Sequence, residues 1–406
     1  MRVVYYVVSN ELVKFSSLLP SNRNRSLLVH SLVKAYGLLD TQENSTQQRT
    51  CLEIIRPVPA DTKTLSQYHT REYLDFVLNS KKLHTDTLYT QKAELGLEED
   101  CPPFAGLPAY VRLIAAANAL YASTGDAQIS VCWDGGRHHA QKARASGFCY
   151  VADCILAILA LKRATNLARS PRTKPRIMYL DLDLHFSDAV SQAFSSSAGV
   201  SSAAQVLTFS IHHSAPGFFP VSELAFLPDP DNLLFDPFTL SMPLQRGASD
   251  ATFARIWPCV ERVKQAFDPD IAVVQCGVDG LAGDPHAVWN WSLGAADGSL
   301  GWCIKRICNE WGCKVLLLGG GGYNSPNAAR AWAYLTAIAL GRDIPLDADV
   351  PDHATFPLYA PSFTLDVPAG NAQDHNSAQY LETVDRSFER VAIMIEEHLS
   401  SALQTQ

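Results

Sequence analysis

The sequence predicts an α/β protein in which a mostly parallel β-sheet is covered by helices on both faces. Short β-rich runs alternate with longer segments of helical periodicity along the 406 residues, and this alternation is typical of parallel sheets. The central strand segments are almost entirely apolar, as expected of strands that are buried on both faces. No linker long enough to divide two domains is visible, so we expect a single domain over residues 1–406.

Six segments are expected to be strands and at least five to be helices. The strands are Val3–Val8, Gln128–Trp133, Arg176–Leu184, Gln205–Ile211, Ile271–Cys276 and Lys314–Leu318. The helices include Tyr110–Ala122, Val151–Ala164, Phe253–Phe267, Gly301–Trp311 and Ala328–Leu340. Ser325 is expected to cap the last of these, because Pro326 then occupies the first helical position, which proline favours.

Charge and cysteine usage limit the classes of partner and compartment. The net charge is -8, from 33 Lys and Arg against 41 Asp and Glu, so we expect no direct nucleic-acid binding, which requires a clustered basic surface. The basic segment Lys162–Arg176 is interpreted as a solvated connection, with a nuclear-import segment as the alternative.

The ten cysteines lack any CxxC pair, which indicates reduced thiols in a cytosolic or nuclear protein.

No membrane association is expected. The N-terminal run Arg2–Val8 lacks a cleavage site and is interpreted as a first strand rather than a secretory signal. The longest uninterrupted apolar run, Cys154–Leu161, is far shorter than the roughly 20 residues that cross a bilayer.

Ionisable side chains and glycines follow five of the expected strands. Because ligand sites in parallel α/β sheets lie beyond the carboxyl ends of the strands, we expect these residues to meet at one edge of the sheet. They are Asp134, His138 and His139 after the second strand, Asp181, Asp183, His185 and Asp188 at the third, His212 and His213 at the fourth, Asp279 after the fifth, and Gly319–Gly322 with Tyr323 after the sixth.

The segment YLDLDLHFSD, residues 179–188, predicts a metal site. Its alternation puts Asp181, Asp183 and His185 on one face of a strand and three leucines on the other. Two buried carboxylates repel each other unless a cation lies between them. Mixed Asp and His ligands suit Zn²⁺, with Fe²⁺ or Mn²⁺ possible, and Asp279 would complete a three-ligand site with an open position. The alternative is that the carboxylates pair with arginines or cap loops.

His138, His139 and Tyr323 are candidates for acid–base and oxyanion roles. Two imidazoles beside a metal, each oriented by a carboxylate such as Asp181 or Asp188, would form an acid–base pair that works near neutral pH. The glycine run before Tyr323 matches neither GxGxxG nor GK[ST], so it indicates close approach of the backbone to a ligand rather than phosphate binding. The tyrosine hydroxyl would be an oxyanion donor, or alternatively part of the core.

Six motifs together resemble the class I branch of the zinc-dependent histone deacetylases, and most closely its type-eight members and their fungal relatives. The resemblance runs from about Arg25 to the C-terminal helix and implies the fold shared by arginases and deacetylases, with the active site at the C-terminal ends of the strands. The motifs are Asp134-Gly-Gly-Arg-His-His-Ala-Gln-Lys142, Ala145-Ser-Gly-Phe-Cys-Tyr150, Asp181-Leu-Asp-Leu-His185, Pro216-Gly-Phe-Phe-Pro220, Gln275-Cys-Gly-Val-Asp279 and Leu318-Gly-Gly-Gly-Gly-Tyr-Asn324.

The resemblance also implies a role for each site residue. Zinc would be bound by Asp183, His185 and Asp279, and a structural K⁺ by oxygens of Asp181, Asp183, His185, Ser210 and Ile211. His139 would be the general base and then the acid, assisted by His138, with Asp181 and Asp188 orienting His138 and His139 respectively. Tyr323 would polarise the acetyl carbonyl. Gly147, Phe148 and Phe219 would line the acetyl-lysine tunnel, with Asp100 and His286 at its rim and Arg25 near an inner acetate-release channel.

The activity implied is hydrolysis of Nε-acetyl-lysine in proteins, with release of acetate. The substrate would be a histone tail or a chromatin protein such as a cohesin subunit, in the nucleus or cytoplasm. A corepressor complex that represses transcription would be a further partner. The alternatives are an acetylpolyamine or other small-molecule amidohydrolase, and a non-catalytic chromatin scaffold. Arginase-type chemistry fits less well, because the His pair occupies the region where a second metal would need further Asp ligands.

The sequence departs from the family pattern at four places. Phe186-Ser187 replaces the usual His-Gly after the metal-binding histidine, and Val221-Ser222-Glu223 replaces Gly-Thr-Gly. His286 stands where an apolar rim residue is usual, and Arg137 stands where many members have an apolar residue before the His pair. We expect these changes to affect loop conformation, rim specificity and rate rather than the type of reaction.

Overall fold

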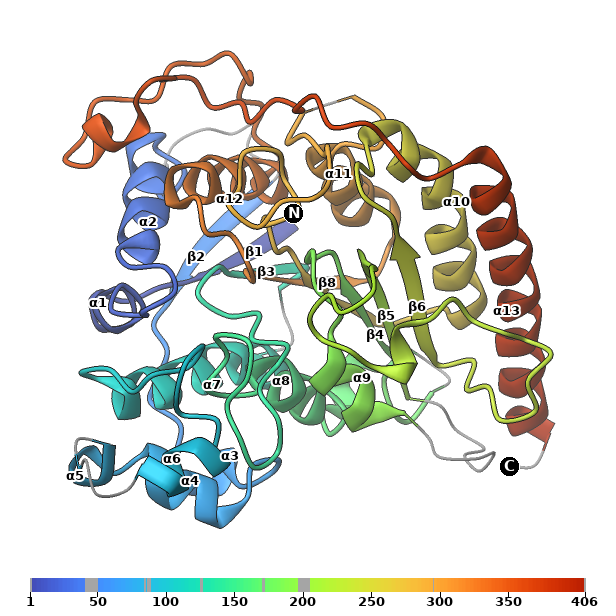
Figure 1. Cartoon of the computed structure of the whole chain (residues 1–406), viewed down its shortest axis with the longest axis horizontal. Coiled ribbons are helices and arrows are strands. Elements are labelled where there is room, and N and C mark those ends of the chain that lie inside the picture. The colour runs from blue at the N-terminus through green and yellow to red at the C-terminus, as the bar shows by residue number, and fades with distance from the viewer. Residues whose placement is uncertain are drawn as a thin grey trace.

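The described residues form a single eight-stranded sheet in which every strand is parallel to its neighbours (Figure 1). The strand order is β2-β1-β3-β8-β7-β4-β5-β6. This computed structural model describes residues 2–40, 50–83, 85, 89–124, 127–169, 172–195, 205–294 and 296–404. The predicted α/β class with a parallel sheet is therefore confirmed, whereas the single domain over 1–406 stays a prediction.

All six predicted strands are present; β8 has its predicted bounds, and the other five have shifted ends. The observed bounds are β1 Arg2–Val7, β3 Ile129–Cys132, β4 Ile177–Asp181, β5 Val206–His213, β7 Ile271–Gln275 and β8 Lys314–Leu318. Two differences matter for the site. β4 ends at Asp181, so Asp183 and His185 lie in the bend that follows the strand and not within it. β5 extends through His213, so His212 and His213 belong to the strand instead of following it.

Two strands were missed by the sequence analysis, and they form the two edges of the sheet. They are β2 Thr50–Ile55, beside β1, and β6 Thr239–Leu244, beside β5. β2 carries an exposed Glu53, and β6 contains Pro243. Proline lacks a backbone N–H, so within a sheet it is tolerated mainly at an edge. Edge strands therefore lack the continuous apolar pattern that identifies a central strand.

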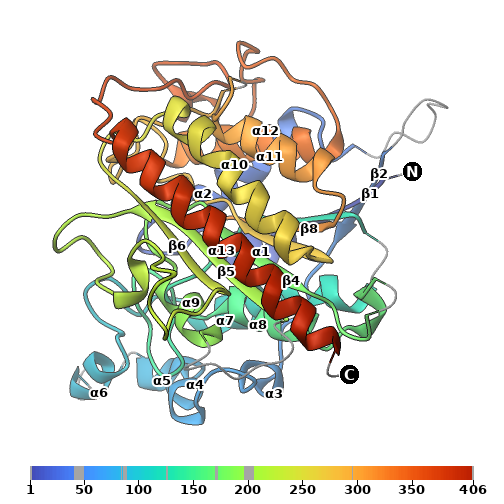
Figure 2. The ribbon, with the colours of Figure 1, turned by 90° about the vertical axis from the view of Figure 1, so that its right-hand side faces the viewer.

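Helices cover both faces of the sheet, as predicted. One face is covered by α7 Leu107–Thr124, α8 Asp153–Leu161 and α9 Asp188–Phe194, and the other by α2 Arg25–Ala35, α10 Asp250–Phe267, α11 Leu300–Glu310, α12 Ser325–Leu340 and α13 Ala378–Gln404 (Figure 1). The 90° view shows α10 and α13 side by side over β5 and β6 (Figure 2). The shorter helices are α1 Asn10–Ser16, α3 Thr62–Leu65, α4 Arg71–Val77, α5 Ser80–Leu83 and α6 Tyr89–Glu94, with 3₁₀ turns η2 Thr165–Leu167, η3 Glu223–Ala225 and η4 Phe356–Tyr359.

The N-cap of α12 differs from the prediction. Asn324, not Ser325, is the capping residue, and its side-chain oxygen accepts a hydrogen bond from the backbone N–H of Asn327. Ser325 is instead the first helical residue. Asn and Ser are comparably good N-caps, so the sequence alone did not separate the two positions.

The core consists of apolar layers on the two faces of the sheet. Trp133 stacks on Trp332 in one layer with ring centroids 5.7 Å apart, and both indoles are buried.

The ten cysteines form no disulfide, and eight of them are buried. None of the described helices is long and apolar enough to cross a membrane. The basic segment after α8 contacts the connection between α10 and β7. Arg169 and Arg172 each form ion pairs with Asp268 and Asp270.

Candidate active site

Three residues at the C-terminal ends of β4 and β7 form a compact metal-binding group. Ligand atoms of Asp183, His185 and Asp279 all lie within 4.8 Å of one another. Nδ1 of His185 lies 2.9 Å from Oδ2 of Asp279 and 3.2 Å from Oδ1 of Asp183. Both carboxylates are buried and the imidazole is nearly so. Two carboxylates and one imidazole that converge in this way suit Zn²⁺ and leave a fourth position for water or substrate.

The surrounding backbone holds the carboxylate of Asp183 in place. Oδ2 of Asp183 accepts hydrogen bonds from Nε2 of Gln275, at 2.8 Å, and from the backbone N–H of Gly321, at 2.7 Å. A Cβ atom added at Gly277 would lie 2.2 Å from the same oxygen, and one added at Gly321 would lie 2.4 Å from Oδ2 of Asp279. These glycines therefore permit the backbone to approach both carboxylates closely.

The charges of this group are unbalanced without a cation. Burial alone would lower the pKa of His185, but hydrogen bonds and charge from Asp183 and Asp279 raise it to about 10. Burial and the neighbouring charge of Asp183 raise the pKa of Asp279. Two buried carboxylates thus share one imidazolium, and a divalent cation would balance them.

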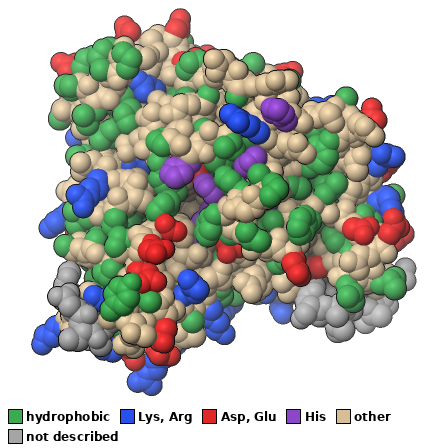
Figure 3. All heavy atoms as spheres, viewed as in Figure 1, with side chains coloured by type: hydrophobic (Ala, Val, Ile, Leu, Met, Phe, Trp, Pro, Cys, Tyr) green, Lys and Arg blue, Asp and Glu red, His purple; other side chains and the backbone are tan. Residues whose placement is uncertain are grey.

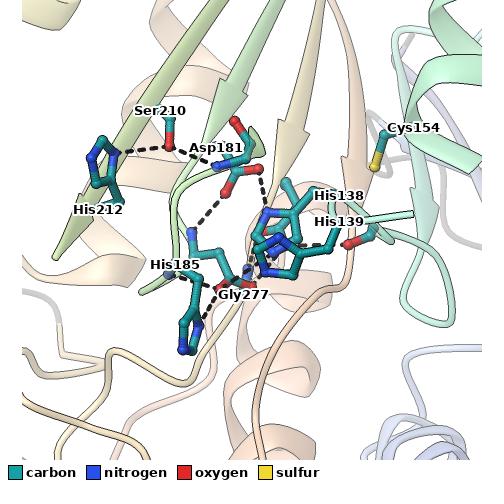
Figure 4. Close-up of polar contacts among 12 residues, drawn as sticks. His138, His139, Cys154, Asp181, His185, Ser210, His212 and Gly277 are labelled. Atoms are coloured by element: carbon teal, nitrogen blue, oxygen red, sulfur yellow. Dashed lines mark hydrogen bonds and ion pairs between the residues drawn. The ribbon is translucent and has the colours of Figure 1, made fainter. Parts of the chain in front are cut away.

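Two adjacent histidines from the loop after β3 lie beside the triad, each paired with its own carboxylate (Figure 4). Nδ1 of His138 lies 2.9 Å from Oδ2 of Asp181, and Nδ1 of His139 lies 2.7 Å from Oδ1 of Asp188. The two imidazole centroids are 3.9 Å apart. The structure therefore brings together the His–Asp pairs named from the sequence.

The two imidazoles have opposite electrostatic surroundings. Burial opposes protonation of His138, but the charges of Asp181 and Asp183 raise its pKa to about 9. Burial and then the nearby His138 lower the pKa of His139 to about 4, despite its bond to Asp188. At neutral pH His138 is thus protonated and His139 is neutral, so His139 is the imidazole able to accept a proton.

Tyr323 follows the glycine run after β8. Its backbone N–H donates to Oδ2 of Asp284 at 2.6 Å, which fixes the loop between the glycine run and α12. Burial and the charges of Asp279 and Asp183 raise the pKa of its phenol well above the ordinary value. The hydroxyl therefore stays protonated at neutral pH and is able to donate a hydrogen bond to a developing oxyanion.

Aromatic rings surround the approach to the triad. Phe219 lies 4.9 Å from the His139 ring, and Phe148 lies 5.4 Å from the Tyr323 ring, measured between centroids. A Cβ atom at Gly147 would meet the rings of His139 and Phe219 at 2.6 and 2.9 Å. A side chain at position 147 would therefore clash with both rings. In the space-filling view, histidine side chains gather near the middle of the face shown (Figure 3).

Two expected rim residues lie on the surface. His286 is exposed, and its ring centroid lies 4.5 Å from that of Tyr323. Asp100 is exposed in the turn before α7. Its neighbour Cys101 contacts the backbone carbonyl of Cys149, in the loop that carries Phe148. The structure thus places His286 beside the aromatic approach, and it places Asp100 next to Cys101, which contacts the loop that carries Phe148.

The proposed potassium ligands lie deeper, between β4 and β5. Asp181 and Ser210 are register partners on these strands, and Asp181, Ser210 and Ile211 are fully buried. Oδ1 of Asp181 accepts the backbone N–H of Asp183, and Oδ2 contacts His138 and the hydroxyl of Tyr179. A buried carboxylate next to a hydroxyl is an oxygen-rich environment, which fits a hard cation.

His212 and His213 are not part of the metal group, and the sequence did not predict either of them as a ligand. The ring of His212 contacts Oγ of Ser210 and the carbonyl oxygen of Ala225, and burial lowers its pKa to about 4. His213 contacts the carbonyl oxygen of Leu244. Both rings find partners inside the fold because β5 continues through them. The ring of His212 points toward Ser210 (Figure 4).

Residues 19–339 match the family described as the histone deacetylase domain. Histone deacetylase 8 of Danio rerio is 34% identical over 388 residues, which cover 94% of this chain and 93% of the relative. Histone deacetylase 8 of Xenopus tropicalis is 33% identical, with 94% and 96% covered, and histone deacetylase 19 of Arabidopsis thaliana is 30% identical, with 90% and 67% covered. The chain belongs to the histone deacetylase family. It is accordingly a hydrolase that deacetylates lysine. The family is generally metal-dependent, and the Asp183–His185–Asp279 group of this chain could hold a metal ion.

Several residues that support this deacetylase site were not singled out from the sequence. Phe218 stacks on the His185 ring, with centroids 5.2 Å apart and planes 9° apart. Gln141 donates from Nε2 to Oδ2 of Asp188 at 2.9 Å. Asp153 accepts the backbone N–H groups of Gly136 and Arg137, just before the His pair. Phe218 and Gln141 stand inside quoted motifs, but sequence spacing gives no signal for which way such side chains point.

The Phe186-Ser187 departure is accommodated in the core of this deacetylase. Phe186 is 1% exposed, and its ring lies 4.9 Å from that of His212. The backbone N–H of Ser187 lies 3.4 Å from Oγ of Ser210, and Ser187 is the residue before α9, which begins at Asp188. By contrast, Val221 in the second divergent loop is 83% exposed.

Proposed function

We propose that the protein is a Zn²⁺-dependent hydrolase of Nε-acetyl-lysine in proteins, with Fe²⁺ as an alternative metal. The observation that carries the proposal is that the Asp183–His185–Asp279 group lies close to a neutral imidazole, His139, and acts on a protonated phenol, Tyr323. A non-catalytic scaffold has no physical need for this combination. The proposal extends to a single catalytic domain over residues 1–406.

The donor set fits zinc, because two carboxylate oxygens and one imidazole nitrogen converge with no fourth protein ligand among the described residues. A bound Zn²⁺ would supply Lewis-acid polarisation of the amide carbonyl and of a water molecule. Asp183 and Asp279 would be ionised and His185 neutral in that state, since metal ligands must be deprotonated.

The protein groups would move one proton through the reaction. Neutral His139 accepts the proton of the attacking water at Nε2, while its Nδ1 stays bonded to Asp188. Protonated His138, beside it, contributes positive charge that favours the tetrahedral oxyanion. Tyr323 donates its hydroxyl hydrogen bond to that oxyanion. His139 then returns the proton to the leaving lysine amine, and acetate is the second product.

A structural K⁺ is proposed between β4 and β5, held by oxygens of Asp181, Asp183, His185, Ser210 and Ile211. The carboxylate of Asp181 would face both His138 and the cation. Its charge would then be partly balanced by K⁺, which would moderate how strongly it raises the pKa of His138. Removal of K⁺ should therefore alter activity without removing the zinc ligands.

The substrate is proposed to be an acetylated lysine in a histone tail or in a cohesin-type chromatin protein. Gly147, Phe148 and Phe219 would enclose the alkyl chain, with Asp100 and His286 at the rim. A net charge of -8 complements basic substrate segments. The setting proposed is the nucleus or cytoplasm, in a corepressor complex that represses transcription.

The test is turnover of zinc-loaded protein on a panel of acetylated histone and cohesin-type peptides, with acetylputrescine as the small-molecule comparison. We expect hydroxamate-sensitive deacetylation of at least one peptide, and a loss of turnover on the order of 10² or more in His139→Ala. Absence of peptide turnover would refute the proposal. Turnover of acetylputrescine alone would favour the small-molecule amidohydrolase.

A further inference from the structure

An open cavity lies beside the His139–Asp188 pair, on the outer side of the loop that follows the His pair. Its volume is about 930 Å³, which is within the range of ligand pockets in proteins. Its walls come from α8 and α9, which lie side by side (Figure 1), and from the loops around residues 141–146 and 219–221. Most of the residues that line this cavity have no role in the proposed reaction.

The cavity and the aromatic approach to the metal group share a wall. The Phe219 ring lines the cavity and also lies 4.9 Å from the His139 ring, measured between centroids. Ser146 lines the cavity as well, and the next residue, Gly147, borders both of those rings. Ser146 and Cys149 exchange two backbone hydrogen bonds, which makes this wall a tight turn. An extended chain advances about 3.3 Å per residue, so a side chain held in the cavity would belong to a residue close to the acetyl-lysine.

Two exposed cations, Lys142 and Arg144, line the cavity. Neither of them forms an ion pair with a carboxylate of the described residues. The chain as a whole carries a net charge of -8, so two cations without an acidic partner are a local exception. Such a place attracts a negatively charged group.

The loop that carries these cations has a fixed backbone. The carbonyl oxygen of Lys142 accepts the backbone N–H of Thr70 at 3.0 Å and contacts Nδ1 of His69 at 3.3 Å. The N–H of Gln141 donates to the carbonyl oxygen of Arg144 at 2.9 Å, which closes the loop as a turn. The two cationic side chains therefore start from fixed positions, and only their rotamers have to be ordered when a ligand binds.

The rest of the lining suits the apolar stem and the oxygens of a carboxylate side chain. Leu159 and Phe194 are partly buried and pack against the apolar core. Burial and then the charge of Asp188 raise the pKa of Tyr68 to about 12. The half-buried Tyr68 hydroxyl is therefore protonated at neutral pH and is able to donate a hydrogen bond to an anion.

The lining also contains an acid, but that acid does not cancel the two cations. Asp188 is the one acid among the described residues that line the cavity. Its Oδ1 lies 2.7 Å from Nδ1 of His139, and its Oδ2 accepts a hydrogen bond from Gln141. Two cations against one carboxylate leave the lining with a net positive charge, which favours an anionic ligand.

We propose that this cavity is a substrate subsite for an acidic side chain close to the acetyl-lysine in sequence, with Lys142 and Arg144 as its recognition residues. The subsite rests on the proposed hydrolysis of acetyl-lysine in proteins and adds a sequence preference to it. The carboxylate would contact the two cations and the Tyr68 hydroxyl, and its stem would lie on Leu159 and Phe194. Glutamate should be preferred to aspartate, because its longer stem covers more of the apolar lining.

The first arm of the test measures kcat/KM on acetylated peptides that differ at one position. A glutamate is moved through the positions on either side of the acetyl-lysine, and each peptide has a glutamine counterpart of the same size. At the best position the wild-type protein should prefer glutamate by about threefold or more, and Arg144→Glu should abolish or reverse this preference. The preference should also disappear in about 1 M salt, where the Debye length is only about 3 Å.

Arg386→Glu is the matched control. It makes the same change of charge at an exposed position on α13, so it should keep the wild-type preference. Arg144→Gln removes the charge without reversing it and should retain part of the preference through Lys142. The Tm of each variant should match that of the wild-type protein, because the substituted side chains are exposed.

The second arm measures peptide binding without turnover. Labelled peptides with a hydroxamate in place of the acetyl amide bind without being hydrolysed, and fluorescence anisotropy gives their Kd. The ratio of Kd for the glutamine peptide to that for the glutamate peptide should be about threefold or more in the wild-type protein, and Arg144→Glu should remove it.

Equal values for the glutamate and glutamine members at every position overturn the subsite, and so does a preference that Arg144→Glu leaves intact. An effect of Arg144→Glu that is the same for every peptide would assign the cavity to a free anion and also overturns it. If the wild-type protein hydrolyses no peptide, the proposed function fails, and the anisotropy arm still decides whether the cavity recognises an acidic residue.

Discussion

Oδ1 of Asp188 lies 2.7 Å from Nδ1 of His139, and the other oxygen of Asp188 accepts a hydrogen bond from Gln141. This carboxylate is partly exposed, whereas Asp181, which pairs with His138, is fully buried. The two His–Asp pairs are therefore not equivalent. The pKa of His139 is lowered to about 4 and that of His138 is raised to about 9, so one imidazole is neutral and the other charged.

The Asp188→Asn variant should lower kcat by a factor on the order of 10² or more. The substitution removes the negative charge that favours the protonated form of His139, so the imidazolium formed after water attack loses its stabilisation. Steady-state kinetics on an acetylated peptide measures the effect. The control is Asp231→Asn, which removes a surface carboxylate paired with Arg390 and should leave kcat unchanged. A loss of less than about threefold in Asp188→Asn would contradict the role assigned to this pair.

Metal binding should release protons and weaken as the pH falls. In the metal-free protein the pKa of His185 is raised to about 10, so this imidazole is protonated at neutral pH and must lose its proton to bind a metal. Protons therefore compete with zinc below about pH 10, and apparent affinity should fall by about tenfold per pH unit for each proton released.

Zinc titration by calorimetry in buffers of different ionisation enthalpy measures this release. His212→Asn is the control, because burial lowers the pKa of His212 to about 4 and it is already neutral. Its titration should match that of the wild-type protein. An observed heat that is the same in every buffer would show that His185 is neutral before zinc arrives.

The sequence predicts the centre of the sheet better than its edges. β8 has the predicted bounds, Lys314–Leu318, because the four-residue apolar run Val315–Leu318 stands between a lysine and a run of glycines, which leaves little freedom. β2 and β6 were missed, since an exposed Glu53 in one and Pro243 in the other interrupt the apolar pattern. Edge strands form because a neighbour is present, and that information is not local to their sequence.

The candidate site could likewise be predicted only in part from the sequence. Carboxylates and imidazoles that follow strand ends could be expected to meet, and Asp183, His185 and Asp279 do so. The sequence could not tell that β5 continues through His212, whose ring contacts Ser210 and Ala225, since a strand end shifted by two residues changes where a side chain lies. Nor could it predict that Phe218 stacks on His185, because stacking depends on how a distant loop folds back.

Phe186→Ala should destabilise the protein by about 3–5 kcal/mol, because it leaves a cavity beneath the loop that carries Asp188. Chemical denaturation monitored by fluorescence measures the change in the free energy of unfolding. Phe226 is 69% exposed, so Phe226→Ala is a matched control that should change stability by no more than about 0.5 kcal/mol. Equal effects of the two substitutions would show that Phe186 is not part of the packed core.

His286→Ala should raise KM for acetylated peptides and leave kcat within about twofold. The His286 ring is exposed and contacts the rings of Tyr323 and Phe148, 4.5 and 6.4 Å away between centroids, so it borders the bound substrate but not the reacting bond. Interactions that are equal in the ground state and the transition state alter KM alone. Kinetics on a peptide and on free acetyl-lysine separates an effect on substrate binding at the rim from an effect on the reacting bond. The peptide extends along the rim, and the free amino acid does not. A fall in kcat on both substrates would instead show that His286 holds Tyr323 in its catalytic position.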